Sequence, residues 1–240
     1  KPSIKTTWTN TLSYQTGENG STAIDWYNAP NPSGDYYSKL PYLIDDPELR
    51  AKAELEIKNN PELLSLDWDG FYDANRSSFR TLENANGVDG QSVSGNWSRY
   101  IVEDRRYDTK SFNAISKISQ QLSSSFKLQG SIAYQWYQKH NYKLVEDLLG
   151  GDYYVDINKF QAFDPENPGS NQNDLNNPNR VLSVGDIFGY NYKTNIRKTE
   201  AFLQGVYEGR KLEAFASLSG DFRQYWRTGL MKNGIFPESS

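Results

Sequence analysis

Side chains capable of covalent chemistry are scarce in this chain. It has a single histidine, His140, placed where a predicted strand meets a long loop. No serine motif of a nucleophilic triad accompanies that histidine. We therefore interpret His140 as a residue at the rim of a loop. The sequence has no cysteine, which excludes a disulfide framework and a thiolate metal site.

Paired carboxylates are the other arrangement that suggests catalysis, because glycoside hydrolysis needs two of them on either side of a bond. Three such pairs stand close together in the sequence: Asp45 with Asp46, Asp67 with Asp69, and Glu103 with Asp104. The chain contains 30 acidic residues among 240, so pairs of this kind arise without a catalytic role. We expect no enzyme activity.

The segment 164–174 is rich in oxygen ligands of the kind that calcium prefers. It lacks the ordered aspartates, the glycine and the distal glutamate of a calcium loop. Asn, Asp, Pro and Gly are also the ordinary turn-forming residues. We therefore expect turns here, with no metal and no cofactor.

Aromatic side chains in the long loops are the better candidates for binding. Aromatic faces stack on sugar rings or pack against peptide side chains, and they bury a large area with few rotatable bonds. The alternative is that these aromatics form small cores within the loops. The first candidates to face a ligand or partner are Trp26, Tyr36, Tyr37 and Trp97.

The elements that position these loops are predicted from a strict alternation, clearest in Phe126–Lys139. Its apolar row is Phe126, Leu128, Gly130, Ile132, Tyr134 and Trp136. At roughly 3.3 Å per residue the stretch is about 46 Å long, or about 33 Å along a membrane normal when tilted by about 45°. Soluble strands usually end after about 5 or 6 residues. The length favours a strand that crosses an outer membrane.

Similar alternation occurs in residues 4–15, 108–122, 198–207 and 211–223, which gives about five long strands. In each, the charged residues keep to one face. In a barrel that face lines the lumen, so we predict that the following residues face the lumen: Lys127, Gln129, Gln135, Lys139, Glu213, Asp221 and Arg223. A soluble sandwich also alternates, although with shorter strands, and it remains the alternative.

The positions of aromatic residues and the lengths of the connections predict how the strands are oriented in the membrane. Tyr14, Trp136 with Tyr137, and Tyr225 with Trp226 fall near the same end of three strands, as in the aromatic girdle of an outer-membrane barrel. The connections at 123–125 and 208–210 are short, as periplasmic turns are. Those at about 16–106 and 140–193 are long, as extracellular loops are, and we expect them to be folded.

One helix is predicted in the first long loop. Asp46 is a good N-cap, Pro47 suits the first helical position, and Glu48 stands in the first turn. The helix continues to the residue before Pro61. Its apolar residues are sparse, so we expect it to lie on the surface of the loops.

Overall composition agrees with this account. The net charge is −4 and the mean hydropathy is −0.80. Scattered Lys and Arg within a slightly acidic chain argue against nucleic-acid binding, which favours a basic stripe. No stretch approaches the run of about 18 apolar residues of a membrane helix.

Several blocks resemble the barrel region of TonB-dependent outer-membrane receptors, in particular SusC-like importers. They are 23–42 (AIDWYNAPNPSGDYYSKLPY), 100–113 (YIVEDRRYDTKSFN), 147–160 (DLLGGDYYVDINKF), 172–192 (QNDLNNPNRVLSVGDIFGYNY) and 227–238 (RTGLMKNGIFPE). The resemblance implies a barrel of about 22 strands, of which residues 1–240 form a part. It also implies a plug domain and a TonB box, neither of which we find in this chain.

The resemblance implies a nutrient importer of the Gram-negative outer membrane. Its extracellular loops would capture a nutrient, an oligosaccharide or a peptide, and its barrel wall would enclose a plug-gated path. The implied partners are outer-membrane lipid, the TonB complex acting through the plug, and a SusD-like surface lipoprotein. From the residues alone, the competing hypothesis is a soluble β-rich glycan-binding module with aromatic loops.

Overall fold

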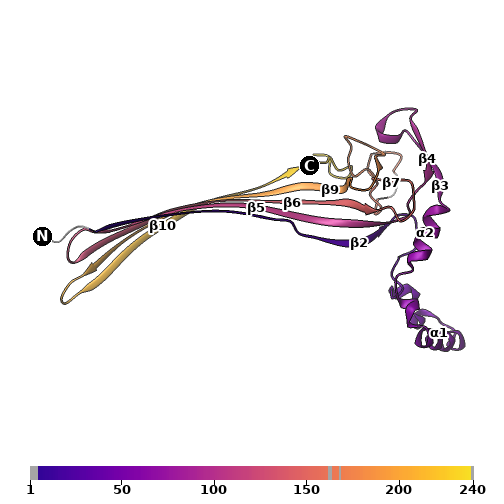
Figure 1. Ribbon diagram of the computed structural model, residues 1–240, viewed down its shortest axis with the longest axis horizontal. Coiled ribbons are helices and arrows are strands. Elements are labelled where there is room, and N and C mark those ends of the chain that lie inside the picture. Colours follow the sequence, from indigo (N-terminus) through magenta and orange to yellow (C-terminus); the bar gives the residue numbers. More distant parts are fainter. Residues whose placement is uncertain (1–4, 162–163, 168, 239–240) are drawn as a thin grey trace. The chain divides into compact units, whose positions relative to one another are not determined.

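The computed structural model describes residues 5–161, 164–167 and 169–238, so the predicted strand residue Ile4 and the loop residue Pro168 lie outside the described residues. The described chain is dominated by antiparallel β-strands, as the sequence predicted, and it has a few short helices (Figure 1), of which the sequence predicted one. It divides into two compact units. The first comprises Lys1–Gly20, Arg106–Asn141 and Asn191–Leu230, and the second comprises Ser21–Arg105, Tyr142–Tyr190 and Met231–Ser240.

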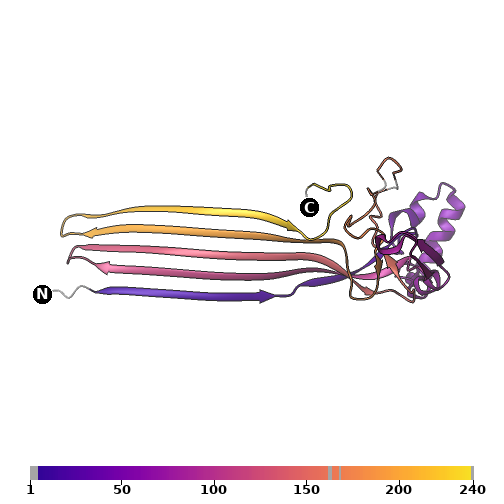
Figure 2. The same ribbon diagram turned by 90° about the horizontal axis from the view of Figure 1, so that it is seen from above.

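The first unit is a sheet of long strands in the order β1–β5–β6–β9–β10, with neighbouring arrows alternating in direction (Figure 2). Three of these strands also contribute residues to the second unit. The strands are β1 (Thr6–Gly17), β5 (Tyr100–Gln121), β6 (Phe126–Asp147), β9 (Ile187–Glu208) and β10 (Glu213–Gly229). Within the described residues β1 and β10 pair on one side only, so these strands form an open sheet and do not close into a barrel.

The long strands extend further than the alternation indicated. β5, β6 and β9 each contain 22 residues. β5 already begins at Tyr100 and β6 continues to Asp147, so parts of the segments 16–106 and 140–193 are strand and not loop. The reason is that backbone pairing does not require apolar alternation. The charged run 103–106 interrupts the alternation without interrupting the strand.

One face of this sheet collects the apolar rows. Trp8 pairs with Ile118, and Leu203 pairs with Leu218, so each pair shares a face. A Cβ on Gly130 would lie 3.5 Å from Cδ1 of Leu203 and 3.7 Å from Cγ2 of Ile118, which places the apolar row of β6 on the same face. The row is exposed in this chain: Leu12 is 72% exposed, Ile132 62% and Leu218 76%.

The residues predicted to face a lumen lie on the opposite face. Asp221 pairs with Glu200 and Arg223 with Lys198, and Glu213 is on the same side of β10. Lys127, Gln129, Gln135 and Lys139 occupy the corresponding side of β6 by the alternation of the strand. This face is less uniformly polar than the sequence indicated, because Phe202 and Phe215 also lie on it.

The second unit is built from short elements. α1 spans Pro47–Asn59, and the Asp46 side chain accepts hydrogen bonds from the backbone N–H groups of Glu48 and Leu49, which confirms the predicted cap. No described residue of α1 is buried, as expected. The other elements are α2 (Trp68–Arg76), β2 (Gly20–Trp26), β3 (Phe79–Glu83), β4 (Ser92–Asn96), β7 (Tyr154–Val155), β8 (Val181–Leu182), η1 (Tyr37–Lys39), η2 (Pro41–Leu43), η3 (Pro61–Leu64) and η4 (Ala85–Gly87).

The helix α2 was not predicted, because its nine residues include Gly, Asp and Asn, which are weak helix formers. Tertiary packing stabilises this helix despite its low intrinsic propensity, because Phe71 and Asn75 of α2 are buried. Phe71 packs with Tyr100 and Leu149 in one core cluster. The other core cluster of the unit comprises Ile101, Val145, Tyr154, Leu182 and Phe188. The long connections therefore fold around cores of their own.

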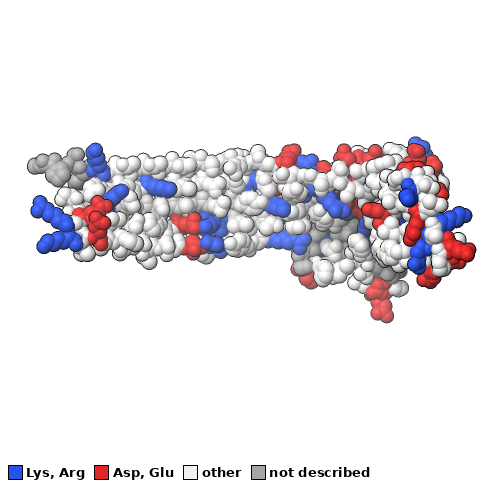
Figure 3. Space-filling model, turned by 90° about the horizontal axis from the view of Figure 1, so that it is seen from below, with Lys and Arg blue, Asp and Glu red and all other residues white. Residues whose placement is uncertain are grey.

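Charged side chains are distributed differently over the two units. On the face drawn in Figure 3 they are widely spaced over the long strands and dense over the second unit. No helix within the described residues is both long and apolar enough to span a bilayer.

Candidate binding groove

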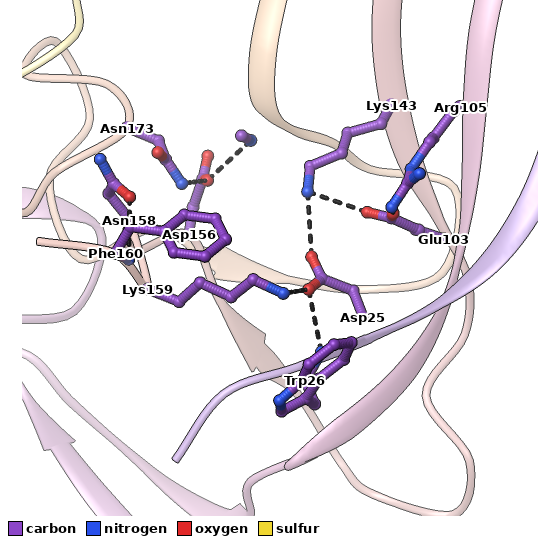
Figure 4. A network of polar contacts seen from close by, with 11 residues as sticks. Asp25, Trp26, Glu103, Arg105, Lys143, Asp156, Asn158, Lys159, Phe160 and Asn173 are labelled. Atoms are coloured by element: carbon purple, nitrogen blue, oxygen red, sulfur yellow. Dashed lines mark hydrogen bonds and ion pairs between the residues drawn. The ribbon is translucent and has the colours of Figure 1, made fainter. Parts of the chain in front are cut away.

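A chain of ion pairs runs through the second unit (Figure 4). Lys143 donates to Oδ2 of Asp25 at 2.9 Å and to Oε2 of Glu103 at 2.8 Å. Lys159 pairs with the other oxygen of Asp25, and Arg105 pairs with the other oxygen of Glu103. The order along the chain is Arg105–Glu103–Lys143–Asp25–Lys159, so three cations alternate with two carboxylates. Asp25 and Glu103 are buried, and the network supplies the partners that buried charges require.

The glycine at position 189 makes room for this network. Gly189 has φ +72°, a conformation that side chains rarely adopt, and a Cβ on it would lie 2.3 Å from Cε of Lys143. Its N–H donates to Oδ1 of Asp156 at 2.9 Å. Asp156 is itself held by Arg180 at 2.8 Å and by the Asn173 amide at 2.8 Å. The backbone at Gly189 is thus fixed, and Lys143 passes directly over it.

The charges of the network shift its pKa values in opposite directions. Burial alone raises the pKa of Asp25, but the Lys143 and Lys159 ammonium groups outweigh burial and lower it. Burial alone lowers the pKa of Lys143, but Asp25 and Glu103 outweigh it and raise that pKa. The pKa of Tyr154 lies well above its ordinary value, chiefly through burial and then through the nearby carboxylates. All three groups remain in their ordinary protonation state at neutral pH.

Lys159 connects the network to an open groove of about 650 Å³. Its Nζ lies 4.2 Å from the ring centroid of Trp26 and 5.3 Å from that of Phe160, which are cation–π distances. The Phe160 ring is 87% exposed. The groove is lined by Trp26, Tyr27, Asn28, Ala29, Pro30, Arg99, Lys159 and Phe160.

Main-chain and side-chain contacts hold the wall of the groove in place. The Arg99 guanidinium donates to the carbonyl oxygen of Asn28, through Nε at 3.2 Å and through a second nitrogen. The Tyr100 hydroxyl donates to the carbonyl oxygen of Pro30 at 2.9 Å. The buried Asn75 of α2 accepts from the Arg99 N–H at 2.7 Å. These contacts fix the backbone of the wall at Asn28 and Pro30.

The four aromatic candidates have different places. Trp26 lines the groove. Trp97 stacks on Tyr27 with centroids 5.5 Å apart, and its Nε1 is buried with no hydrogen-bond partner among the described residues. Tyr36 and Tyr37 form a tilted pair 4.6 Å apart at η1 and do not line the groove. The structure thus places one candidate on the groove wall and one, Trp97, against the wall residue Tyr27.

The other residues singled out by chemistry have local roles. His140 Nε2 lies 2.6 Å from Oδ1 of Asn191 in the first unit. Asp46 caps α1, and Asp67 caps α2 by accepting from the Gly70 N–H at 2.9 Å. In the segment 164–174 the side chain of Asp164 accepts from the Glu166 N–H, so the predicted turn chemistry is present. Within the described residues no group of three or more His, Cys, Asp or Glu side chains could hold a metal.

Sequence reasoning missed most of the groove and its network. Asp25, Lys143, Lys159, Phe160 and Arg99 were not singled out, and Glu103 was named only as half of an incidental carboxylate pair. A usable signal existed, because the block 23–42 holds Asp25 and Trp26, and the block 147–160 holds Lys159 and Phe160. The pairing between them was not visible, because Lys159 and Asp25 lie 134 residues apart.

No family model, curated protein or solved structure matches this chain.

Proposed function

We propose that this chain is part of a TonB-dependent outer-membrane importer, in which the sheet of the first unit forms part of the barrel wall. The observation that carries the proposal is the exposed apolar face shared by all five strands of the β1–β10 sheet as described. Soluble monomers rarely expose an apolar patch beyond a few hundred Å². Bilayer lipid covers such a face without the cost of about 25 cal/mol per Å² that water imposes.

The aromatic residues near one end of the face support a membrane boundary. Tyr14 lies six residues along β1 from Trp8, and Trp136 lies six residues along β6 from Gly130. Trp8 and Gly130 both border the same shallow apolar hollow in the sheet, so the two aromatics stand at similar heights along β1 and β6, which are separated by β5. On β10, Trp226 follows Leu218, which borders that hollow too. Rings with a polar tip are typical of the headgroup region.

The unpaired edges of β1 and β10 also fit a part of a larger barrel. A bilayer does not tolerate open sheet edges, so in the intact protein each edge pairs with a further strand. The spanning part of β6 is residues 126–139. The second unit, including Lys143 and the groove, then belongs to the extracellular loops. We propose that it captures a nutrient, while the TonB complex drives transport through a plug.

This function implies outer-membrane lipid around the apolar face, and a SusD-like lipoprotein as a partner for the loops. It assigns no catalytic residue, no cofactor and no nucleic-acid partner. The expectation that Lys127, Gln129, Gln135, Lys139, Glu213, Asp221 and Arg223 line the lumen becomes part of the same proposal, because they lie on the face opposite the lipid.

Single cysteines test the topology cleanly, since the chain has no cysteine of its own. Ser124→Cys and Arg210→Cys place the probe in the two short turns, and Lys52→Cys places it on the exposed surface of α1. In intact cells that express the full-length protein, we expect a membrane-impermeant maleimide to label Lys52→Cys alone. The turn positions should become labelled only after the outer membrane is permeabilised.

Labelling of all three positions in intact cells, or recovery of the protein in the soluble fraction, would overturn the proposal. Recovery in the soluble fraction would instead favour the glycan-binding module.

A further inference from the structure

The groove in the second unit has an uneven distribution of charge. Among the residues that the structure describes, its lining includes the cations Arg99 and Lys159 and no carboxylate. Lys159 is the end member of an ion-pair chain in which three cations meet two carboxylates, so that chain carries one net positive charge. Within the described residues, Arg99 has no carboxylate within ion-pair distance, and it donates to the neutral carbonyl of Asn28. The groove is therefore electropositive, although the whole chain carries a net charge of −4.

The two cations retain donors for a ligand. An ammonium group has three N–H donors, and a guanidinium has five. Lys159 uses its hydrogen bond to Asp25, and Arg99 uses its bonds to Asn28. The remaining donors on these two side chains suit a carboxylate, which accepts charge-assisted hydrogen bonds.

The aromatic rings add a second requirement. The Lys159 ammonium group lies over the rings of both Trp26 and Phe160, and Phe160 is 87% exposed. An exposed phenylalanine beside a cation gains nothing from water, but it offers a flat apolar face on which a ring can stack. Among the described residues, the nonaromatic apolar lining consists of Ala29 and Pro30, which offer little apolar surface to a peptide side chain.

From these observations we infer that the groove binds a short oligosaccharide that carries carboxylates, with its sugar rings on Trp26 and Phe160 and its carboxylates at Arg99 and Lys159. The volume of about 650 Å³ lies within the range of about 300–1,000 Å³ that is usual for small-ligand sites. The inference rests on the proposed function in one respect, because it takes the groove to face the outside of the cell.

Matched ligands test the role of charge. The full-length protein in detergent is titrated by calorimetry with tetragalacturonate and with a hyaluronan tetrasaccharide, each beside its fully methyl-esterified form. The esters keep the sugar rings and lose the negative charge. We expect at least one acid to bind at least 10-fold more tightly than its ester, with an affinity that falls as salt rises. Equal affinity for acid and ester, or no binding of either acid, would overturn the inference.

Matched variants test whether the ligand binds in this groove. Phe160→Ala removes an exposed ring without opening a core, and we expect it to weaken binding of the acid at least 10-fold. Phe79→Ala, at a phenylalanine that is 70% exposed on β3 outside the groove, serves as its control and should bind as the unaltered protein does. Arg99→Gln should reduce the preference for acid over ester, whereas Lys52→Gln on α1 should not. Unchanged binding by Phe160→Ala would place the ligand elsewhere and reject this site.

The two proposals fail separately. If the cysteines label as expected but neither acid binds, the importer proposal is retained and the binding inference is rejected. If the protein proves soluble and still binds the acid, the importer proposal is rejected and the binding inference is retained.

Discussion

Lys143 and Asp25 are 118 residues apart in the chain, yet Nζ of Lys143 lies 2.9 Å from Oδ2 of Asp25. The same ammonium group lies 2.8 Å from Glu103. One lysine therefore neutralises two buried carboxylates from different strands, β2 and β5. The contact ties three distant segments of the second unit together, and it places Asp25 where Lys159 and the groove meet it.

Replacing Lys143 tests how much the second unit depends on this contact. Lys143→Met keeps most of the side-chain volume but removes the cation shared by two buried carboxylates, each of which keeps one cation, Lys159 for Asp25 and Arg105 for Glu103. We therefore expect a loss of stability smaller than the loss of about 3–5 kcal/mol for a buried charge left without any partner. The measurement is a urea titration of the full-length protein, followed by tryptophan fluorescence. The triple variant Asp25→Asn, Glu103→Gln, Lys143→Met also removes the two buried negative charges and should recover much of that loss. A single variant as stable as the unaltered protein would show that the network contributes little.

Gly189→Ala tests the space beneath Lys143. The added Cβ enters a positive-φ position and meets Cε of Lys143 at 2.3 Å. Gly90→Ala is the matched control, since Gly90 has φ +76° and nothing within 4 Å of the added atom. The backbone strain of about 1–2 kcal/mol applies to both. Only Gly189→Ala should cost a further 1–3 kcal/mol, roughly the effect of overpacking. Equal losses in urea titrations would mean that Lys143 shifts freely.

Asn75→Ala should destabilise the second unit strongly. The Asn75 amide donates to the carbonyl oxygens of Tyr100 at 2.8 Å, Leu148 at 2.9 Å and Leu149 at 3.1 Å. Its side-chain oxygen accepts from the N–H of Arg99. The side chain is fully buried, so its loss leaves several backbone groups unsatisfied, at about 1–3 kcal/mol for each one that water cannot reach.

The control for Asn75→Ala is Asn59→Ala, at an exposed residue of α1, which should change stability by less than about 0.5 kcal/mol. Hydrogen exchange of the amides near residues 99–100 and 148–149 measures the local effect. Protection of those amides that survives Asn75→Ala would contradict the role assigned to this side chain.

The pH dependence of the second unit follows from the two shifted pKa values. The pKa of Asp25 is lowered on folding, so its stabilising contribution is present above the unfolded value of about 3.9 and is lost as pH falls through the folded pKa. The pKa of Lys143 is raised, so its contribution is present below about 10.4 and is lost as pH rises through the folded pKa. Stability measured by urea titration should therefore form a plateau between these limits.

Asp25→Asn should flatten the acid side of that plateau, because the asparagine does not titrate. The alkaline side should remain, since Glu103 still faces Lys143. An unchanged acid limb would assign the acid sensitivity to another carboxylate.

Arginine scanning of β6 tests the assignment of its faces. Ile132 is 62% exposed on the apolar face, and Ile132→Arg should cost about 2–4 kcal/mol if that face meets lipid near the bilayer midplane. Ser131 lies on the other face of β6, so Ser131→Arg should reduce stability only slightly. Folding into lipid vesicles, followed by the shift in electrophoretic mobility of the folded form, measures both. An equal loss of stability in the two inserted variants would contradict the assignment of the apolar face of β6 to lipid.

The sequence by itself determined the features that depend on near neighbours. Alternation specified which side of each long strand is apolar, because successive side chains on a strand point to opposite faces. Asp46 and Pro47 specified the start of α1, because a cap acts on backbone groups within one turn. The short turns and the turn-forming segment 164–174 follow from equally local chemistry.

Only the tertiary structure decided the rest. The strand at 100–107 and the helix α2 are formed by backbone pairing and by the burial of Phe71 and Asn75, which local propensity does not encode. The groove needed Trp26 and Lys159 to meet from positions 133 residues apart in the numbering. Their proximity depends on how the packing of the core clusters brings distant segments of the second unit together. Hydrophobic burial is non-directional, so a single sequence reveals which residues are buried more readily than which of them meet.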